Sequence, residues 1–197
     1  ALKKFDDGEL FVEEVFSENI LFDDNKIKNA SFDQDKGFGL RGVVNDEVIF
    51  THNSELTDKS LTNALSNLKV TSKTNPLSQI REHSKSNSSL YTSKNPINIV
   101  SLNEKINFLE KVNKYAREID SNVKEVSVSL NGNHQNIEVT TKNGNMFYDS
   151  RPLVRMNINI SVDKKGKIES GSFGAGGRYL YEELFKEGAW KSGDEKA

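Results

Sequence analysis

The stretch Val154-Arg155-Met156-Asn157-Ile158-Asn159-Ile160-Ser161-Val162 carries the clearest structural pattern in the chain. Apolar residues alternate there with Arg, Asn and Ser. A period of two residues indicates a β-strand with one buried and one polar face, as found in antiparallel sheets. Asp163-Lys164-Lys165-Gly166 follows as a turn signal and predicts a return strand over residues 167–173.

Further hairpins are predicted before this strand. Residues 126–130 alternate in the same way, and Asn131-Gly132-Asn133 predicts a tight turn into a return strand near residues 137–139. Asn143-Gly144-Asn145 predicts a second turn of this kind. Together these segments form a predicted antiparallel meander.

The N-terminal part predicts another meander. Its expected strands cover residues 9–22, 26–33, 36–44 and 47–51. Turn residues such as Asp24-Asn25 separate them.

Two helices have recognisable starts. Ser101 and Glu104 fit a capping box for a helix that ends near Asp120, and Thr57 fits the N-cap of a helix to about residue 68. A short helix over residues 179–185 is expected after a cluster of glycines. Residues 71–96 show neither the two-residue period of a strand nor the 3.6-residue period of a helix. They predict a flexible loop, linker or flap.

The sequence therefore predicts an α+β fold: two mainly antiparallel β-meanders with a few packed helices and a long central loop. We expect a single domain over residues 1–197. Residues 1–70 would hold the first meander and a helix, and residues 97–197 a helix, the second meander, a glycine-rich turn and a short helix.

Composition narrows the classes of function. Lys and Arg number 27 and Asp and Glu 29, a net charge of −2, which argues against direct nucleic-acid binding through a basic surface. No cysteine is present, so zinc sites with thiolate ligands are excluded within these residues. No apolar run approaches the roughly 20 residues of a membrane-spanning helix. The chain begins at Ala1 without a Met and is expected to be cut from a longer protein.

The candidate binding residues lie in and near the glycine cluster. Glycines without side chains would let a ligand's main chain approach closely, and a neighbouring Arg could pair with a carboxylate. The alternative for the glycines is a strand-to-helix turn with positive φ, and for Arg155 a cross-strand salt bridge. The candidates are Arg151, Arg155, Gly174, Gly176, Gly177 and Arg178.

No complete active site can be assembled from motifs. The three histidines, His52, His83 and His134, are scattered, and we expect them to be solvated in turns and loops rather than metal ligands. No catalytic residue or metal ligand is predicted in this chain. It is therefore either a binding or assembly domain, or its catalytic groups lie elsewhere.

Three blocks together resemble the TldD/PmbA family, also called modulators of DNA gyrase. The first is Asp35-Lys36-Gly37-Phe38-Gly39-Leu40-Arg41, and the second runs from Tyr115 to Leu130. The third runs from Asp149-Ser150-Arg151-Pro152-Leu153-Val154-Arg155 to Arg178, and it is closer to the TldD branch than to the PmbA (TldE) branch.

The resemblance implies a cytoplasmic zinc metallopeptidase that acts on short or unfolded peptides and pairs with a TldD- or TldE-type subunit. The family's zinc motif, H-E-x-x-x-H with a Cys, is absent here, so the chain is interpreted as the N-terminal, non-metal domain with zinc in an absent C-terminal domain. It would guide substrate and assist subunit assembly, for example by strand addition at residues 153–162. The alternatives are the inactive PmbA/TldE-type partner and a gyrase-linked regulatory binding protein.

Overall fold

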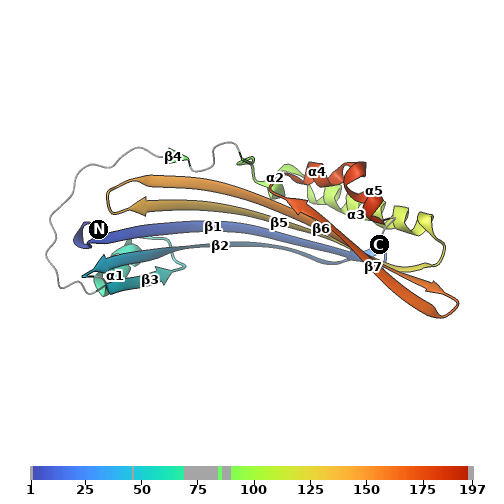
Figure 1. The fold of residues 1–197 in the computed structure, drawn as a ribbon, viewed down its shortest axis with the longest axis horizontal. Helices are drawn as coiled ribbons and strands as arrows, with labels where there is room; N and C mark the ends of the chain where they lie inside the picture. The colour runs from blue at the N-terminus through green and yellow to red at the C-terminus, as the bar shows by residue number, and fades with distance from the viewer. Residues whose placement is uncertain (1, 46, 69–83, 86–89, 195–197) are drawn as a thin grey trace. The chain divides into compact units, whose positions relative to one another are not determined.

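The computed structural model describes residues 2–45, 47–68, 84–85 and 90–194. It shows a seven-stranded sheet with the strand order β3-β2-β1-β5-β6-β4, in which β7 also pairs with β6 (Figure 1). The strands are β1 (Asp7–Asp23), β2 (Lys26–Val44), β3 (Glu47–Asn53), β4 (Ser84–Lys85), β5 (Val123–Thr141), β6 (Met146–Lys164) and β7 (Lys167–Gly177). The predicted α+β class is confirmed, and the two meanders join in one sheet because β1 and β5 are neighbours.

Five α-helices and one 3-10 helix accompany these strands in the described residues. They are the 3-10 helix Leu2–Lys4, α1 (Asp58–Asn67), α2 (Pro96–Ile99), α3 (Leu102–Ile119), α4 (Tyr181–Phe185) and α5 (Glu187–Asp194). No helix in the described part of the chain has the length and apolar character needed to cross a bilayer.

Both predicted helix starts are confirmed. The Ser101 hydroxyl accepts a hydrogen bond from the Glu104 N–H (3.3 Å), and the Glu104 carboxylate accepts one from the Ser101 N–H (2.9 Å). Thr57 caps α1 in the same reciprocal way with Ser60. Each cap satisfies backbone N–H groups that have no partner within the helix.

Two predicted breaks between strands are wrong. Residues 26–33 and 36–44 belong to one strand, β2, and Asn131-Gly132-Asn133 lies inside β5 instead of forming a turn. A Cβ atom at Gly132 would overlap the Tyr181 hydroxyl, so close packing explains this glycine. The turns with positive φ are at Asp24 and Asn25, Asn45, Gly144, and Lys165 and Gly166 among the described residues.

The predicted loop at residues 71–96 lies mainly outside the described residues. Its described parts include β4, which pairs in parallel with β6 at Phe147 and Tyr148, and Pro96 at the start of α2.

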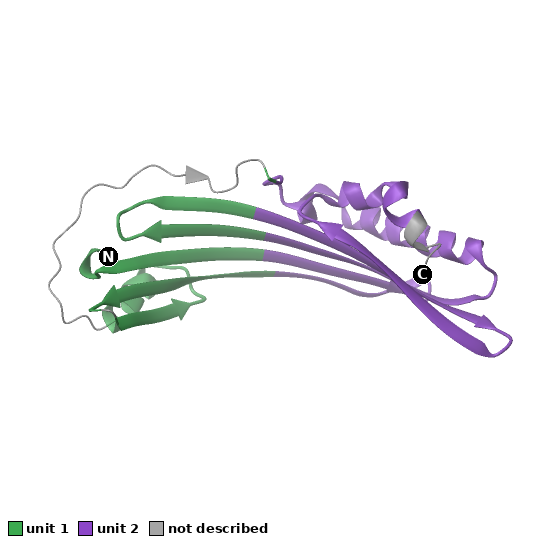
Figure 2. Cartoon of the chain, viewed as in Figure 1, with its two compact units in different colours: residues 1–15, 34–90, 135–150 green, residues 16–33, 91–134, 151–197 purple. Residues whose placement is uncertain are grey.

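The chain divides into two compact units (Figure 2). Unit 1 contains residues 1–15, 34–90 and 135–150, and unit 2 contains residues 16–33, 91–134 and 151–197. In unit 1, a small core forms where residues from the N-terminus, β2 and the end of α1 pack together. Its buried members are Leu2, Phe5, Leu40, Val44 and Leu68.

Unit 2 has the larger core. The apolar faces of β5 and β6 pack against α3, α4 and α5, which all lie on one side of these strands (Figure 2). Val154, Met156 and Ile158 are fully buried, as the alternation predicts. The single Trp of the chain, Trp190, is also fully buried and makes edge-to-face contacts with Phe108 and Tyr115.

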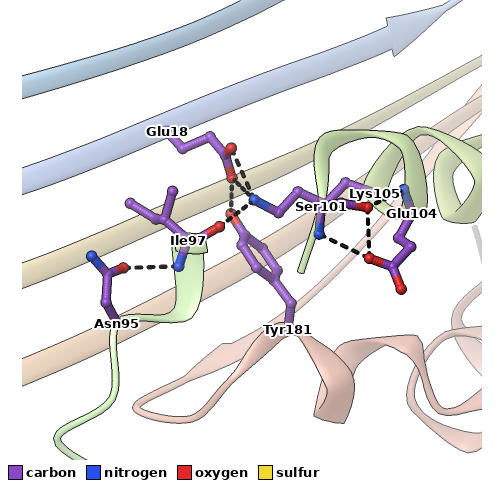
Figure 3. Close-up of polar contacts among 7 residues, drawn as sticks. All are labelled: Glu18, Asn95, Ile97, Ser101, Glu104, Lys105 and Tyr181. Carbon is purple, nitrogen blue, oxygen red and sulfur yellow. Dashed lines mark hydrogen bonds and ion pairs between the residues drawn. The ribbon is translucent and has the colours of Figure 1, made fainter. Parts of the chain in front are cut away.

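A buried ion pair joins α3 to the sheet of unit 2 (Figure 3). The Nζ of Lys105 lies 2.9 and 2.8 Å from the two carboxylate oxygens of Glu18, and it also donates to the carbonyl of Ile97 at 2.8 Å. The Tyr181 hydroxyl donates to Glu18 at 3.1 Å, and burial raises the pKa of Tyr181. Because Lys105 is only 1% exposed, its charge depends on these partners.

At the surface, α5 is held to α3 by Glu187, whose carboxylate lies 2.9 Å from Lys111 and 2.7 Å from Lys191. The hydrogen bonds from Lys191 and Lys111 lower the pKa of Glu187 from 4.5 to about 2. A lowered pKa stabilises the fold above the unfolded value, and this stabilisation is lost as the pH falls through the folded value.

We therefore expect Glu187→Gln to lower the urea midpoint slightly at neutral pH and to make the loss of stability between pH 4.5 and about 2 less steep. Urea unfolding at neutral pH and at about pH 3 measures both effects, and salt should reduce the difference. Glu182→Gln, at an exposed position of α4, is the control. An equal effect of both variants at both pH values would contradict the assignment.

Candidate functional site: the polar face of β6 and β7

The predicted site residues fall on an antiparallel pair of strands. In the register of β6 and β7, Arg155 lies opposite Gly176, Asn157 opposite Gly174, and Val154 opposite Gly177. The fold thus brings Arg155 together with three of the predicted glycines. Arg151 and Arg178 lie outside the paired stretch.

The prediction of a glycine-rich turn or loop at Gly174, Gly176 and Gly177 is wrong, because these residues end strand β7. None of the three has a positive φ. Close packing explains their missing side chains. A Cβ at Gly176 would lie 2.5 Å from the Val154 carbonyl oxygen, and a Cβ at Gly177 would overlap the ring of Tyr179.

Arg155 is exposed and extends over the glycine strand. Its Nε donates to the Asn157 side-chain oxygen at 2.8 Å, and a Cβ at Gly174 would lie only 2.9 Å from its Nη2. Within the described residues Arg155 has no ion pair. It therefore does not form the cross-strand salt bridge that was the alternative. Its guanidinium can therefore pair with an external carboxylate.

The other two predicted arginines have different surroundings. The Arg178 guanidinium lies 5.2 Å from the centre of the Tyr91 ring, which is a cation–π contact. Arg151 is half-buried on β6, before the stretch that pairs with β7.

A row of hydrogen-bonded polar side chains continues from Arg155 across the sheet of unit 2, and the sequence interpretation missed it. We call these six residues the Asn/Ser row. Its bonds run from Arg155 Nε to Asn157 Oδ1 (2.8 Å), Asn157 Nδ2 to Ser129 Oγ (3.3 Å), Asn131 Nδ2 to Ser129 Oγ (3.5 Å), Asn19 Nδ2 to Asn131 Oδ1 (2.6 Å) and Asn29 Nδ2 to Asn19 Oδ1 (2.9 Å).

The Asn/Ser row occupies the face of β5 and β6 that the helices do not cover. Its residues on these strands alternate with the buried Val126, Val128, Val154 and Met156, so they point away from the helical side. Amide and hydroxyl groups can both donate and accept hydrogen bonds. This face can therefore bind backbone or side-chain polar groups of many sequences.

The two histidines that the structure describes, His52 and His134, form no metal centre. His52 is exposed on β3, and His83 lies outside the described residues. The expectation that His134 is solvated in a hairpin is wrong: it is buried inside β5, with Nε2 3.3 Å from the Ser93 carbonyl oxygen. No group of three or more His, Asp or Glu side chains gathers in the described residues, so these residues do not fit a zinc site.

Two protein-family models match this chain. A family model described as "PmbA/TldA metallopeptidase central domain" matches residues 95–195, and one described as "PmbA/TldA metallopeptidase domain 1" matches residues 8–69. This chain belongs to the PmbA/TldD family. The resemblance seen in the sequence blocks is thereby confirmed.

Curated relatives of the PmbA/TldD family match most of the chain. It is 28% identical over 187 residues to the "Metalloprotease TldD homolog" of Haemophilus influenzae, covering 93% of this chain and 39% of that protein. The protein of the same name from Buchnera aphidicola (subsp. Acyrthosiphon pisum) is 29% identical over 182 residues, covering 91% and 37%. The chain thus spans about two fifths of the length of these relatives.

Solved structures of the family share the fold. A putative modulator of DNA gyrase from Bacteroides thetaiotaomicron has a TM-score of 0.68 and 14% identity, covering 91% of this chain and 43% of that one. TldE from Thermococcus kodakarensis has a TM-score of 0.62 and 17% identity, covering 95% and 44%. At these identities the likeness concerns the fold.

Proposed function

We propose that this chain is the N-terminal, non-metal part of a TldD-like zinc metallopeptidase that degrades or processes short or unfolded peptides in the cytoplasm. The observation that carries the proposal is the match of 93% of the chain to 39% of a protein named as a TldD metalloprotease homolog. Zinc would be held in the remaining part of the parent protein. The chain itself would guide peptides and contribute to pairing with a TldD- or TldE-type subunit.

The geometry of unit 2 supports a peptide-guiding role. Strand addition at residues 153–162 is ruled out, because β6 lies between β5 and β7 in the sheet. Strand β7 offers the available edge, since in the described residues it pairs only with β6. An extended peptide could add to β7 through main-chain hydrogen bonds, which tolerate many side chains.

The test compares this chain, the zinc-loaded parent protein and the parent with its TldE-type partner on an unfolded peptide. We expect cleavage by the parent with its partner, its loss with EDTA, and no cleavage by this chain alone. Cleavage by the chain alone that EDTA abolishes would contradict the proposal.

Arg155→Ala in the parent is expected to impair peptide turnover or subunit pairing while the domain stays folded. Because Arg155 is exposed and its side chain donates a hydrogen bond to Asn157, the free energy of unfolding should change by less than about 1 kcal/mol. Turnover, sedimentation and thermal unfolding give the three readouts. Lys124→Ala, exposed on β5, is the control, and a large loss of stability in Arg155→Ala would show a structural role instead.

A catalytically inactive PmbA/TldE-type partner is the second candidate, because the matching family models are named for PmbA as well. The remaining gene sequence decides between the two. An H-E-x-x-x-H motif there selects the peptidase, and its absence selects the partner. For a gyrase-linked binding protein, the third candidate, a salt-dependent affinity for duplex DNA would be expected.

A further inference from the structure

Unit 1 contains a groove of about 410 Å³ on the face of β1, β2 and β3, which we call the Gly39 groove. It is bordered by Phe11 and Glu13 of β1, Asp35 and Gly39 of β2, and Phe50 and His52 of β3. Its volume falls within the range of about 300–1,000 Å³ that is usual for ligand pockets.

The groove lies on the side of these strands away from the core of unit 1. Leu40, which follows Gly39, is buried in that core, and Leu10, which precedes Phe11, packs against it. Because successive side chains of a strand point to opposite faces, Gly39 and Phe11 face the other way. The bottom of the groove is therefore the bare backbone of β2.

Local structure does not require a glycine at position 39. Its φ is not positive, and a Cβ there would meet only the Phe50 ring, at the ordinary contact distances of 3.4 and 3.5 Å. Gly37 differs, because a Cβ there would lie 2.8 Å from the Asn53 carbonyl oxygen. A glycine inside a strand costs about 0.5–1 kcal/mol relative to alanine. The missing side chain at Gly39 leaves the groove open, and no packing or backbone constraint accounts for it.

The groove combines aromatic walls with a negative end. Phe50 is 64% exposed at one wall, and Phe11 lies on the other. Glu13, which accepts a hydrogen bond from Gln135, and Asp35 contribute two carboxylates against the single ammonium group of Lys36. Within the described residues no ion pair neutralises Glu13 or Asp35. Arg41, farther along β2, is already bound to Glu9 (3.0 Å) and Asp7 (3.3 Å).

We propose that the Gly39 groove binds an extended peptide through one large apolar side chain and a basic side chain two residues away, because side chains two apart in an extended chain point to the same face. The apolar side chain lies over Gly39 between Phe11 and Phe50, and the basic side chain pairs with Asp35 and Glu13. This inference rests on the proposed peptide substrate and assigns it a sequence preference. A groove with excess carboxylate favours a cationic partner over an acidic one.

The test is an NMR titration of this chain with the blocked tetrapeptide acetyl-Phe-Ala-Lys-Ala-amide, in which Phe and Lys share a face of the extended chain. We expect saturable shifts at residues of β1, β2 and β3 that border the groove. The same peptide with Glu in place of Lys, or with Ala in place of Phe, should bind at least tenfold more weakly. Equal binding of the Glu peptide, or no shifts at these strands, would overturn the proposal.

Gly39→Val separates binding from folding. The added side chain fills the groove against Phe50 and is compatible with a strand, so the melting temperature should be unchanged or higher while peptide affinity falls at least tenfold. Asp35→Asn should weaken binding several-fold. Glu14→Gln, a carboxylate on the opposite side of β1 that accepts a hydrogen bond from Gln34, should not. Unchanged affinity in Gly39→Val would overturn the proposal.

Three further outcomes separate this inference from its alternatives. If wild-type chains self-associate in sedimentation and Gly39→Val abolishes this, the occupant is a second copy and the proposal is wrong. If the parent cleaves peptides but Gly39→Val leaves its preference for basic peptides unchanged, the groove assignment fails while the proposed function stands. If the tetrapeptide binds at the groove but the zinc-loaded parent and its partner cleave no peptide, the proposed function fails instead.

Discussion

Lys105→Ala is expected to destabilise the fold by about 3–5 kcal/mol. The substitution leaves the Glu18 carboxylate, whose side chain is only 10% exposed, without its cation, and it also removes the donor to the Ile97 carbonyl. An unpaired buried charge costs far more than the net value of the pair. Urea unfolding followed by the fluorescence of Trp190, the only Trp, measures the loss.

The matched control is the double variant Lys105→Met with Glu18→Gln. It removes both charges and keeps similar volumes, so it should recover most of the stability lost in Lys105→Ala. Lys114→Ala, whose ion pair with Glu118 is exposed, should change stability by less than about 1 kcal/mol. A similarly small loss in Lys105→Ala would show that Glu18 finds water or another partner.

Gly176→Val is the second variant with a large expected effect, a loss of about 3 kcal/mol or more. Its Cβ would lie 2.5 Å from the Val154 carbonyl oxygen and 3.0 Å from the Arg155 Cα. Both atoms belong to the backbone of β6, so relief requires the two strands to separate locally. Thermal unfolding and amide exchange at Val154 and Gly177 report the change.

Gly188→Ala is the control for this variant, because a Cβ there would meet no atom within 4 Å. Its stability should equal or slightly exceed that of the wild type. Wild-type stability in Gly176→Val would mean that the end of β7 is not held against β6 in solution.

The parts of the fold that the sequence predicts well are those with local causes. The strand at Val154–Val162 has one buried face, so its alternation is plain. Helix α3 begins with a capping box formed by residues three apart. Such signals lie within a few residues of the structure that they specify.

The errors arise where distant residues decide the conformation. Asn-Gly-Asn occurs at residues 131–133 and at 143–145, yet only Gly144 adopts a positive φ. Gly132 is extended inside β5, which pairs with β1 and β6, and Tyr181 packs where its side chain would lie. The glycines of β7 likewise fit the backbone of β6 and not a turn. Local sequence does not contain this information.

The candidate site was predictable only in part. Arg155 and three glycines were found from composition and spacing, and the register of β6 and β7 brings them together. The Asn/Ser row was missed because Asn19 and Asn131 lie 112 residues apart. The Gly39 groove was missed as well, although Asp35, Gly37 and Gly39 belong to the first sequence block that resembles the family. Its walls come from three strands and could not be placed without their pairing.

The division into units has a practical consequence for protein production. Each unit is made of three separate chain segments, so neither can be expressed from one uninterrupted stretch of the gene. A truncation that ends at residue 69 would keep residues 16–33 without the rest of unit 2. One that starts at residue 95 would keep residues 135–150 without the rest of unit 1. Both truncations are therefore poor candidates for independent folding, and a split-gene reconstitution would have to restore both units together.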